Sequence, residues 1–431
     1  MTLGRVQPAA TAMAPGATRD GPVAMLPESQ GVLAGPRQRR VLLVAPQPFY
    51  QDRGTPIAIR QVLEALSQLG YPVDVLTYPV GAEVQIPGVR ILRVANLLAI
   101  KHVPIGLSAR KIVLDIPLSF ALQRLLRRGN YTCVHAVEEA AFPAVLLGPH
   151  YKVPVIYDMQ SSLPEQLVTR IGFRSGPLRQ LANWLERLLL TRADFVVSSA
   201  GLESRVKMLA PYAKVREWHF PGVMVPGTTT GGDALRRRLS ISPDVPVVVY
   251  GGTFEGYQGL GELIGAIPII RAKISDATFV LVGAENGSSS AIRAEAARLV
   301  EAGVVRIIDR QPRNEISSYF SMADVLVSPR AHGGNLPLKI FDYLAAGRPI
   351  VATDIPTHRT VLNSDRAMLV PPHSRGLAEG ILSLLCDPVR AATLGHAARV
   401  YAEERLGWNN FVASLGELYE EVHRHAAASR S

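Results

Sequence analysis

Short apolar runs alternate with helical patterns along most of the chain. The run Val41–Ala45 has the length and unbroken hydrophobicity of a strand that is buried on both faces. A helical pattern over Ile57–Leu69 follows, Gly70 is placed as a helix stop, and Val73–Thr77 reads as the next strand. A strand, a helix and a second strand in this order form a βαβ unit, which predicts a parallel sheet.

The same alternation continues on both sides of one aperiodic stretch. Around residues 220–244 the periodicity lapses into Pro, Gly and Thr, which marks a domain boundary. The further predicted strands are Tyr131–Ala136, Val153–Asp158, Asp194–Ser198, Val245–Tyr250, Thr278–Val282, Val304–Ile308, Asp324–Ser328 and Pro349–Thr353. Two open α/β sheets joined by a linker bind ligands in the crevice at the carboxyl ends of their strands.

The fold class predicted from this pattern is α/β, with two Rossmann-like domains facing across a cleft. The predicted parts are a disordered leader 1–38, a first domain 39–222, a linker 223–244, a second domain 245–405 and a C-terminal helix 406–431 that can cross back onto the first domain. The leader is rich in Ala, Pro and Gly and has no compact apolar block, so it does not read as a secretory signal.

Composition and charge limit the kinds of ligand and the cellular location that are expected. Hydrophobic residues make up 48% and charged residues 19%, which suits two full cores. The net charge of +10 leaves phosphate-bearing ligands and an anionic membrane surface open, whereas no nucleic-acid motif appears. No run approaches the roughly 20 apolar residues that span a bilayer. Cys133 and Cys386 lie far apart and in no metal-ligand spacing, which favours a reducing compartment. A cytoplasmic protein is therefore expected, and peripheral contact with the inner face of the membrane stays open.

The segment Ser328–Asp354 carries the strongest chemical signal. It reads as a strand end, a glycine-containing loop, a helix, a glycine stop and another buried strand. Gly333 and Gly334 let backbone N–H groups approach an anion, and the following helix aims its positive end at the same point. Lys339 can place an ammonium beside a pyrophosphate, and Asp342 can accept hydrogen bonds from ribose hydroxyls. The alternative is a tight packing loop with a surface ion pair.

This segment resembles glycosyltransferase family 4, whose members are retaining enzymes of the GT-B fold, and in particular a subgroup that carries Asn-x-Pro-x-Lys and then Phe-Glu-Tyr. Residues 52–56, 157–166 and 250–260 are similar to other loops of that subgroup. The resemblance implies an acceptor-binding first domain and a second domain that binds a nucleotide diphosphate sugar. It implies neither a metal nor another cofactor, because amides, a helix N-terminus and basic side chains can stabilise the leaving diphosphate.

The chain departs from the family pattern at three places. The family has a Glu eight residues before a second Glu, and the first usually contacts the donor sugar; here these positions are Gly334 and Asp342. The basic pair that the family places in the loop opening the donor domain is absent from residues 253–258, so Arg330 and Lys339 are expected to supply the charge. Residues 135–139 keep only the first residue of a His-x-His motif.

The resemblance and the loop chemistry together predict a set of site residues. Those expected to bind the donor are Gly252, Thr253, Arg330, Gly333, Gly334, Asn335, Leu336, Lys339 and Asp342. Those expected to face the reacting centre from the first domain are Gly54, Thr55, His135 and Glu138, with a structural role as the alternative for the histidine. Arg53 and Arg60 are candidates for contact with an acceptor phosphate, with a solvated helix face as the alternative for Arg60.

The acceptor is left unknown by the sequence, with a lipid-linked one among the candidates. Residues 108–130 mix apolar side chains with arginines and can form a basic amphipathic helix that lies on anionic lipid. A helix packed on the sheet and interrupted at Pro117 is the alternative. Besides a transferase, a nucleotide-sugar epimerase and a catalytically silent GT-B subunit stay open. A dehydrogenase is disfavoured because no Gly-x-Gly-x-x-Gly follows the first strand.

Overall fold

The computed structural model describes the chain apart from its first residues and several short segments. The described ranges are 39–51, 54–96, 99–101, 103, 108–166, 176–222, 231–284 and 289–428. The predicted leader 1–38 lies outside them. Among the helices in these ranges, none combines the length and the hydrophobicity that crossing a bilayer requires.

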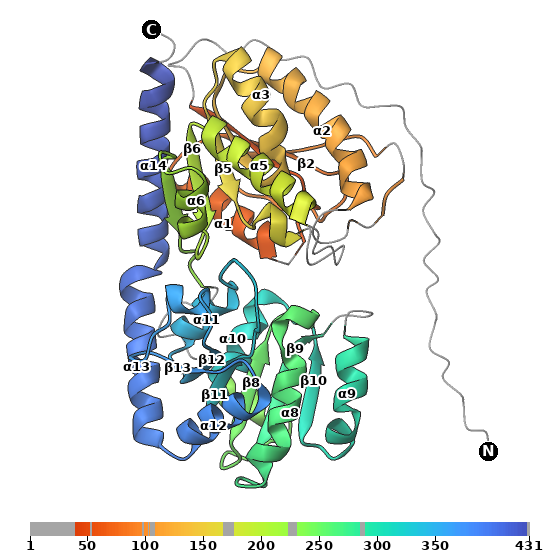
Figure 1. Ribbon diagram of the computed structural model, residues 1–431, viewed down its shortest axis with the longest axis vertical. Helices are drawn as coiled ribbons and strands as arrows, with labels where there is room; N and C mark the ends of the chain where they lie inside the picture. Colours follow the sequence, from red (N-terminus) through yellow and green to blue (C-terminus); the bar gives the residue numbers. More distant parts are fainter. Residues whose placement is uncertain are drawn as a thin grey trace, which may run out of the picture. The chain divides into compact units, whose positions relative to one another are not determined.

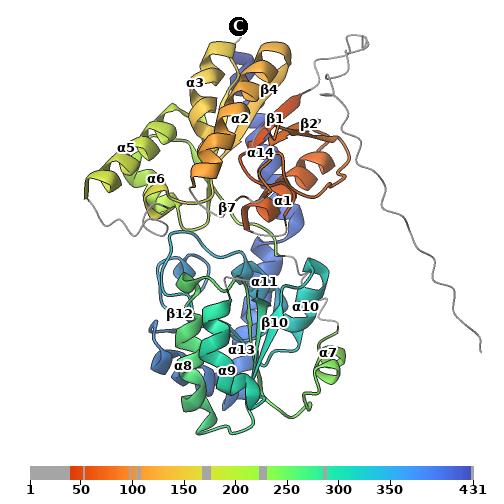
Figure 2. The same cartoon turned by 90° about the vertical axis from the view of Figure 1, so that its right-hand side faces the viewer.

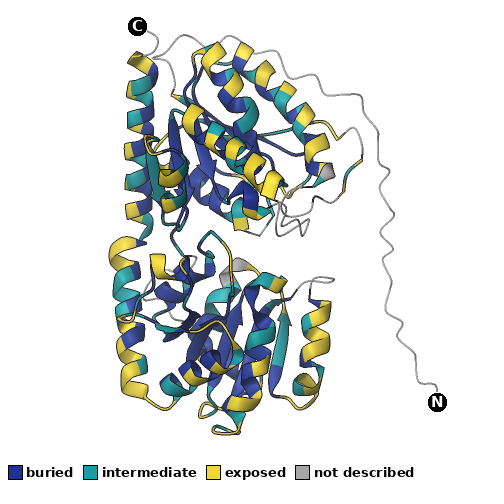
Figure 3. Cartoon of the chain, viewed as in Figure 1, coloured by how far each residue is buried: buried dark blue, intermediate teal, exposed yellow. Residues whose placement is uncertain are grey.

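The first domain is built on a parallel sheet in which seven strands are described, in the order β3-β2-β1-β4-β5-β6-β7. These strands are β1 (Arg40–Ala45), β2 (Val73–Thr77), β3 (Val89–Arg93), β4 (Tyr131–Val137), β5 (Val155–Met159), β6 (Phe195–Ser199) and β7 (Val215–Trp218). The central strands are buried on both faces, as their unbroken apolar runs predict (Figure 3).

Helices cover both faces of this sheet (Figure 1). On one face the core is formed with α2 (Ala109–Arg128), α3 (Ala141–Tyr151), α5 (Gly176–Arg192) and α6 (Glu203–Leu209). On the other it is formed with α1 (Gly54–Gln68) and α14 (Trp408–Ala428). The C-terminal helix therefore completes the core of the first domain. Its Tyr419 hydroxyl lies 2.7 Å from Nδ1 of His135 in β4, and His423 lies 2.9 Å from the Thr132 hydroxyl.

The second domain repeats the arrangement with six described parallel strands, in the order β10-β9-β8-β11-β12-β13. They are β8 (Val247–Gly251), β9 (Thr278–Ala284), β10 (Val305–Asp309), β11 (Val325–Ser328), β12 (Ile350–Thr353) and β13 (Met368–Val370). One face packs on α8 (Leu260–Arg271), α9 (Ser290–Glu301) and α12 (Ser374–Leu385), and the other on α10 (Arg313–Ser321), α11 (Lys339–Ala346) and α13 (Pro388–Arg405). Figure 2 shows α8 beside α9.

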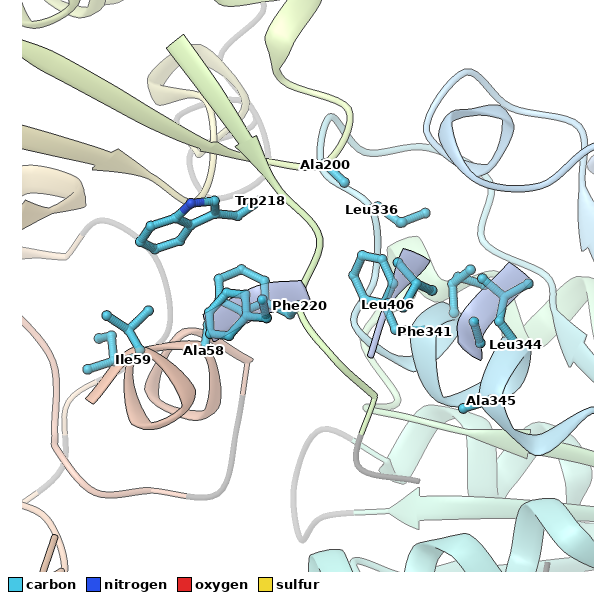
Figure 4. Close-up of a cluster of buried hydrophobic side chains, with 14 of the residues drawn as sticks. Ala58, Ile59, Ala200, Trp218, Phe220, Leu336, Phe341, Leu344, Ala345 and Leu406 are labelled. Atoms are coloured by element: carbon cyan, nitrogen blue, oxygen red, sulfur yellow. The ribbon is translucent and has the colours of Figure 1, made fainter. Parts of the chain in front are cut away.

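One cluster of buried apolar side chains joins the two domains (Figure 4). Trp218 and Phe220 come from the end of the first domain, and both rings pack on Phe411 of α14 at centroid distances of 5.8 and 5.6 Å. The same cluster includes Leu336 and Phe341 of the second domain. Apolar burial therefore stabilises the contact that brings the loop before α11 against the first domain.

The predicted α/β fold of two Rossmann-like domains is confirmed, and the predicted strands lie within a few residues of observed ones. Three strands were not predicted: β3, β7 and β13. Each is only partly buried and β3 and β7 include exposed or half-buried charged residues, so the apolar run that identifies a central strand is missing. Within the interval 223–244, read from the sequence as a linker, the structure has a short helix, α7 (Gly232–Arg238). Arg236 attaches α7 to the second domain through Asp324, at 2.7 Å.

Candidate functional site

The loop between β11 and α11 forms the centre of the candidate site. It follows the carboxyl end of β11, the edge at which parallel α/β sheets bind their ligands. The helix α11 begins at Lys339, and its C-terminal turn closes on Gly347 in the left-handed conformation, at φ 65°. We refer to residues 329–338 as the donor loop.

Lys339 is a buried cation without an acidic partner among its recorded contacts. Its side chain is 8% exposed, and its ammonium donates a hydrogen bond of 3.0 Å to the neutral Oε1 of Gln258. The ammonium also lies 4.0 Å from the centre of the Tyr250 ring. Burial, and then the neighbouring charge of Arg330, hold the pKa of Lys339 well below its ordinary value.

Arg330 is the second buried cation, and it shapes the donor loop. Its guanidinium donates to the carbonyl oxygens of His332 and Asn335, at 2.9 and 3.0 Å, and to the side-chain oxygen of Asn335 at 3.1 Å. Burial lowers the pKa of Arg330. Gly333 adopts φ 136°, and a Cβ there would overlap the guanidinium, so glycine is required for this close approach.

Two like charges thus lie buried next to each other. In the described part of the chain, every hydrogen-bond acceptor recorded for them is a neutral oxygen. Burying charges whose hydrogen-bond acceptors are all neutral is costly, and an arriving anion would recover much of that cost. A glycine loop, a helix start and two buried cations together form a site for a strongly anionic ligand.

Gly252 and Thr253, after β8, line the same place. A Cβ on Gly252 would lie 3.5 Å from Cδ of Lys339, and Gly252 has φ 145°. The Thr253 carbonyl accepts 2.6 Å from the Tyr250 hydroxyl, and its own hydroxyl accepts from Gln258 at 3.4 Å. Tyr250 and Gln258, which contact Thr253, also contact the ammonium of Lys339, so Gly252 and Thr253 lie beside this lysine.

Gly334, Asn335 and Leu336 contact the first domain. The Asn335 amide donates to the carbonyl oxygen of Gln160 at 3.2 Å. The Leu336 N–H, expected to face the donor, instead donates to the carbonyl oxygen of Ala200 at 2.9 Å, and its side chain is buried. The Leu336 N–H therefore already has a hydrogen-bond acceptor in the first domain.

Asp342, on the first turn of α11, is half-buried and lies beside Gly222 at the end of the first domain. A Cβ on Gly222 would come 3.0 Å from Oδ1 of Asp342. The structure thus places this carboxylate near the start of the interdomain connection. Its contact with ribose stays a prediction.

The first-domain candidates fall into two groups. Gly54 opens α1 and is exposed, and Thr55 follows it half-buried, while the neighbouring residues 52 and 53, and with them Arg53, lie outside the described ranges. Arg60 pairs with Glu64 at 2.7 Å one turn along α1. His135 is fully buried, 2.7 Å from Tyr419 and 3.3 Å from Asp158. Its contacts fit a structural role, and a catalytic one stays a prediction.

Glu138 lies at the carboxyl end of β4 in the left-handed region, at φ 48°. Its two carboxylate oxygens accept hydrogen bonds from Ser161 at 2.7 Å and from Gln47 at 3.2 Å. Burial, and then the neighbouring carboxylate of Glu139, raise the pKa of Glu138. A non-glycine residue held at positive φ among loops at this edge is a feature of functional sites, although its role in transfer stays a prediction.

The sequence alone did not identify Tyr250 and Gln258, which surround Lys339, or His358, which contacts the end of β11. Tyr250 and Gln258 lie in the segment 250–260 that resembles a family loop, but both are neutral, so no charge pattern indicated a role for them. His358 is fully buried between Ser328, at 3.1 Å, and the carbonyl oxygen of Thr353, at 2.7 Å. Burial lowers the pKa of His358 to about 4, so it serves as a neutral support for the strand ends.

Comparison with known proteins gives concordant matches for both halves of the chain. Residues 53–206 match the glycosyl transferase 4-like domain, and residues 245–387 match the family described as glycosyl transferases group 1. A D-inositol 3-phosphate glycosyltransferase of Xylanimonas cellulosilytica is 25% identical over 414 residues, which cover 89% of this chain and 95% of the relative. A phosphatidyl-myo-inositol mannosyltransferase of Mycolicibacterium smegmatis is 29% identical over 180 residues, 41% of this chain and 45% of the relative.

Solved structures share the fold. Sucrose-phosphate synthase from Thermosynechococcus elongatus has a TM-score of 0.75 at 21% identity, and the match covers 90% of this chain and 100% of that one. HepE of Anabaena, solved in complex with UDP, has a TM-score of 0.68 at 16% identity, over 89% of this chain and 100% of that one. The two domain matches and the two facing parallel sheets define an enzyme that transfers a sugar to an acceptor. The chain belongs to glycosyltransferase family 4 and has the GT-B fold.

Proposed function

We propose that the donor is a nucleotide diphosphate sugar whose two phosphates bind beside Lys339 and Arg330. The observation that carries this proposal is the pair of buried cations whose recorded acceptors are all neutral. A diphosphate supplies the missing negative charge and fits the glycine-containing start of a helix. HepE, with a similar fold, is solved with UDP, which supports this ligand class.

Transfer in this proposal retains the anomeric configuration. The bond between the anomeric carbon and the leaving phosphate oxygen breaks, and the acceptor oxygen forms its bond on the same face. The acceptor proton passes to the leaving phosphate oxygen. Lys339 and Arg330 stabilise the charge that develops on the diphosphate, so we propose that the reaction needs no metal. The Asn335-x-Pro337-x-Lys339 string further supports membership of the subgroup that carries this motif.

The experiment that tests this function measures donor binding and the stereochemistry of turnover. We expect UDP, GDP or dTDP to raise the melting temperature of the protein, because a ligand that binds only the native state stabilises it. With the matching nucleotide sugar, NMR should first detect a product with the donor's own anomeric configuration, and turnover should persist in EDTA. An inverted first product or complete loss of turnover on chelation would contradict the mechanism, and no response to any nucleotide would contradict the donor assignment.

We further propose a lipid-linked acceptor that is reached from an anionic membrane surface. The helix α2 exposes Ile112, Val113, Ile116 and Phe120, at 61, 41, 55 and 69%. At about 100° per residue these four side chains share one stripe of the helix. Three exposed arginines at 124, 127 and 128 continue it toward the C-terminus. An apolar stripe with flanking positive charge matches the interface of an anionic bilayer.

Replacing both Ile112 and Phe120 with serine is expected to lower binding to vesicles of phosphatidylcholine and phosphatidylglycerol by about tenfold or more, because both side chains would leave the interface. Vesicle co-sedimentation measures this. Met208→Ser, which changes another exposed apolar side chain at 73%, is the matched control. Equal vesicle binding by the double variant and the control would contradict the proposal that α2 docks on an anionic membrane.

A further inference from the structure

The carboxylate of Glu165, from the first domain, lies against the backbone of Gly334 in the donor loop. Glu165 is one of the helical residues 163–166, which follow β5 and precede an interval outside the described ranges. A Cβ built on Gly334 would overlap this carboxylate. Glycine at 334 therefore leaves room for an acidic group that comes from a distant part of the chain.

Other contacts hold the two segments together. The Asn335 amide donates to Gln160 and the Leu336 N–H donates to Ala200, so the two residues that follow Gly334 are attached to loops of the first domain. The apolar cluster that includes Leu336 and Trp218 supports the same contact. The position of Glu165 beside Gly334 thus follows from the packing of the whole loop.

The surroundings of Glu165 are those of a ligand site. Burial lowers the pKa of Arg330, and the charge of Glu165 opposes part of this fall, so the carboxylate acts electrostatically on Arg330. A carboxylate is an acceptor of hydrogen bonds, and sugar hydroxyl groups are donors. A carboxylate that extends the diphosphate site is therefore placed to accept hydrogen bonds from the sugar.

We infer that Glu165 binds the hydroxyl groups of the donor sugar, in place of the glutamate that related enzymes carry at the position of Gly334. This inference rests on the proposed nucleotide-sugar donor and deepens it. Its consequence is that the sugar pocket is assembled from both domains: the second domain holds the diphosphate, and the first contributes the side chain that recognises the sugar.

The experiment compares Glu165→Ala and Glu165→Gln with the wild type, using the nucleotide sugar that the wild type turns over. We expect kcat/KM to fall about 10- to 100-fold in the alanine variant, the range for losing hydrogen bonds to a charged group. The Kd of the nucleoside diphosphate, which lacks the sugar, should rise less than about twofold if only the sugar contact is lost. Glu203→Ala, which removes a half-buried glutamate of α6 that pairs with Lys207, is the control.

Moving the glutamate from position 165 to position 334 by mutation gives the decisive comparison. The double variant Glu165→Ala with Gly334→Glu should recover part of the activity that Glu165→Ala loses, because it returns a carboxylate to the same space from the other domain. Full activity in Glu165→Ala, or an equal loss of diphosphate binding, would overturn the inference while leaving the donor assignment intact. A wild type that neither binds nor cleaves any nucleotide sugar would instead overturn the proposed function.

Discussion

Replacing Lys339 with methionine is expected to weaken binding of a nucleotide diphosphate sugar by about 10- to 100-fold and to raise the melting temperature of the ligand-free protein. The lost affinity is that of one charge-assisted hydrogen bond to phosphate. The stability rises because Lys339 is only 8% exposed and its ammonium has a neutral acceptor, and replacing such a charge with an apolar side chain of similar length is stabilising by about 1–4 kcal/mol. Opposite changes in stability and binding distinguish a functional lysine from a structural one.

Calorimetric titration with UDP-glucose, or with whichever nucleotide sugar binds the wild type, and thermal unfolding measure the two effects. Lys273→Met, which removes an exposed lysine of the same domain, is the matched control and should change neither. A melting temperature that falls in the Lys339 variant, with unchanged donor affinity, would contradict the assignment of this residue to the diphosphate.

The same lysine predicts a pH dependence of known sign. Its pKa is lowered in the free protein, and a bound diphosphate would raise it toward the ordinary value of 10.5, so binding takes up protons. Donor affinity should therefore fall as the pH rises between these two pKa values. The unfolded chain, with the ordinary pKa, also binds more protons than the folded one, so the stability gained in Lys339→Met should shrink as the pH rises toward 10.5. Titrations in buffers of different ionisation enthalpy measure the proton uptake, which the methionine variant should lose.

Replacing Gly259 with alanine is expected to destabilise the second domain by about 2–5 kcal/mol and to abolish donor binding. Gly259 has φ 72°, a conformation that costs an alanine about 1–2 kcal/mol, and its Cβ would also overlap the carbonyl oxygen of Pro329. To avoid this overlap, the backbone at Pro329 would have to move. Because Pro329 directly precedes Arg330, the movement would shift the Arg330 guanidinium away from its place in the site.

Gly256→Ala is the matched control for this prediction. It changes the same residue type in the same loop, at a position where a Cβ would meet no atom within 4 Å. Thermal unfolding and donor titration of the two variants give the comparison. Equal behaviour of the two would show that the close approach of Gly259 to the strand end does not position Arg330.

The central strands could be predicted because burial on both faces leaves an unbroken apolar run. The edge strands β3, β7 and β13 could not: β3, for example, includes Arg90 and Arg93, and its pattern resembles that of a loop. In the site, the proximity of Lys339 and Arg330 could be predicted because both lie in one short segment with the glycines, while their contact with a diphosphate stays a prediction. Glu165 could not be assigned to the donor loop, because its proximity to Gly334 depends on how two domains pack, and no periodicity in the sequence reports such a contact.

The position of α14 has a consequence for how the protein is made. As a nascent chain leaves the ribosome, the strands of the first domain emerge before the second domain, whereas the helix that buries His135 and the rings around Trp218 emerges after it. Until α14 has emerged, that apolar face of the first domain has no partner and is exposed to aggregation. Expressing the first domain without α14 would leave the same face uncovered.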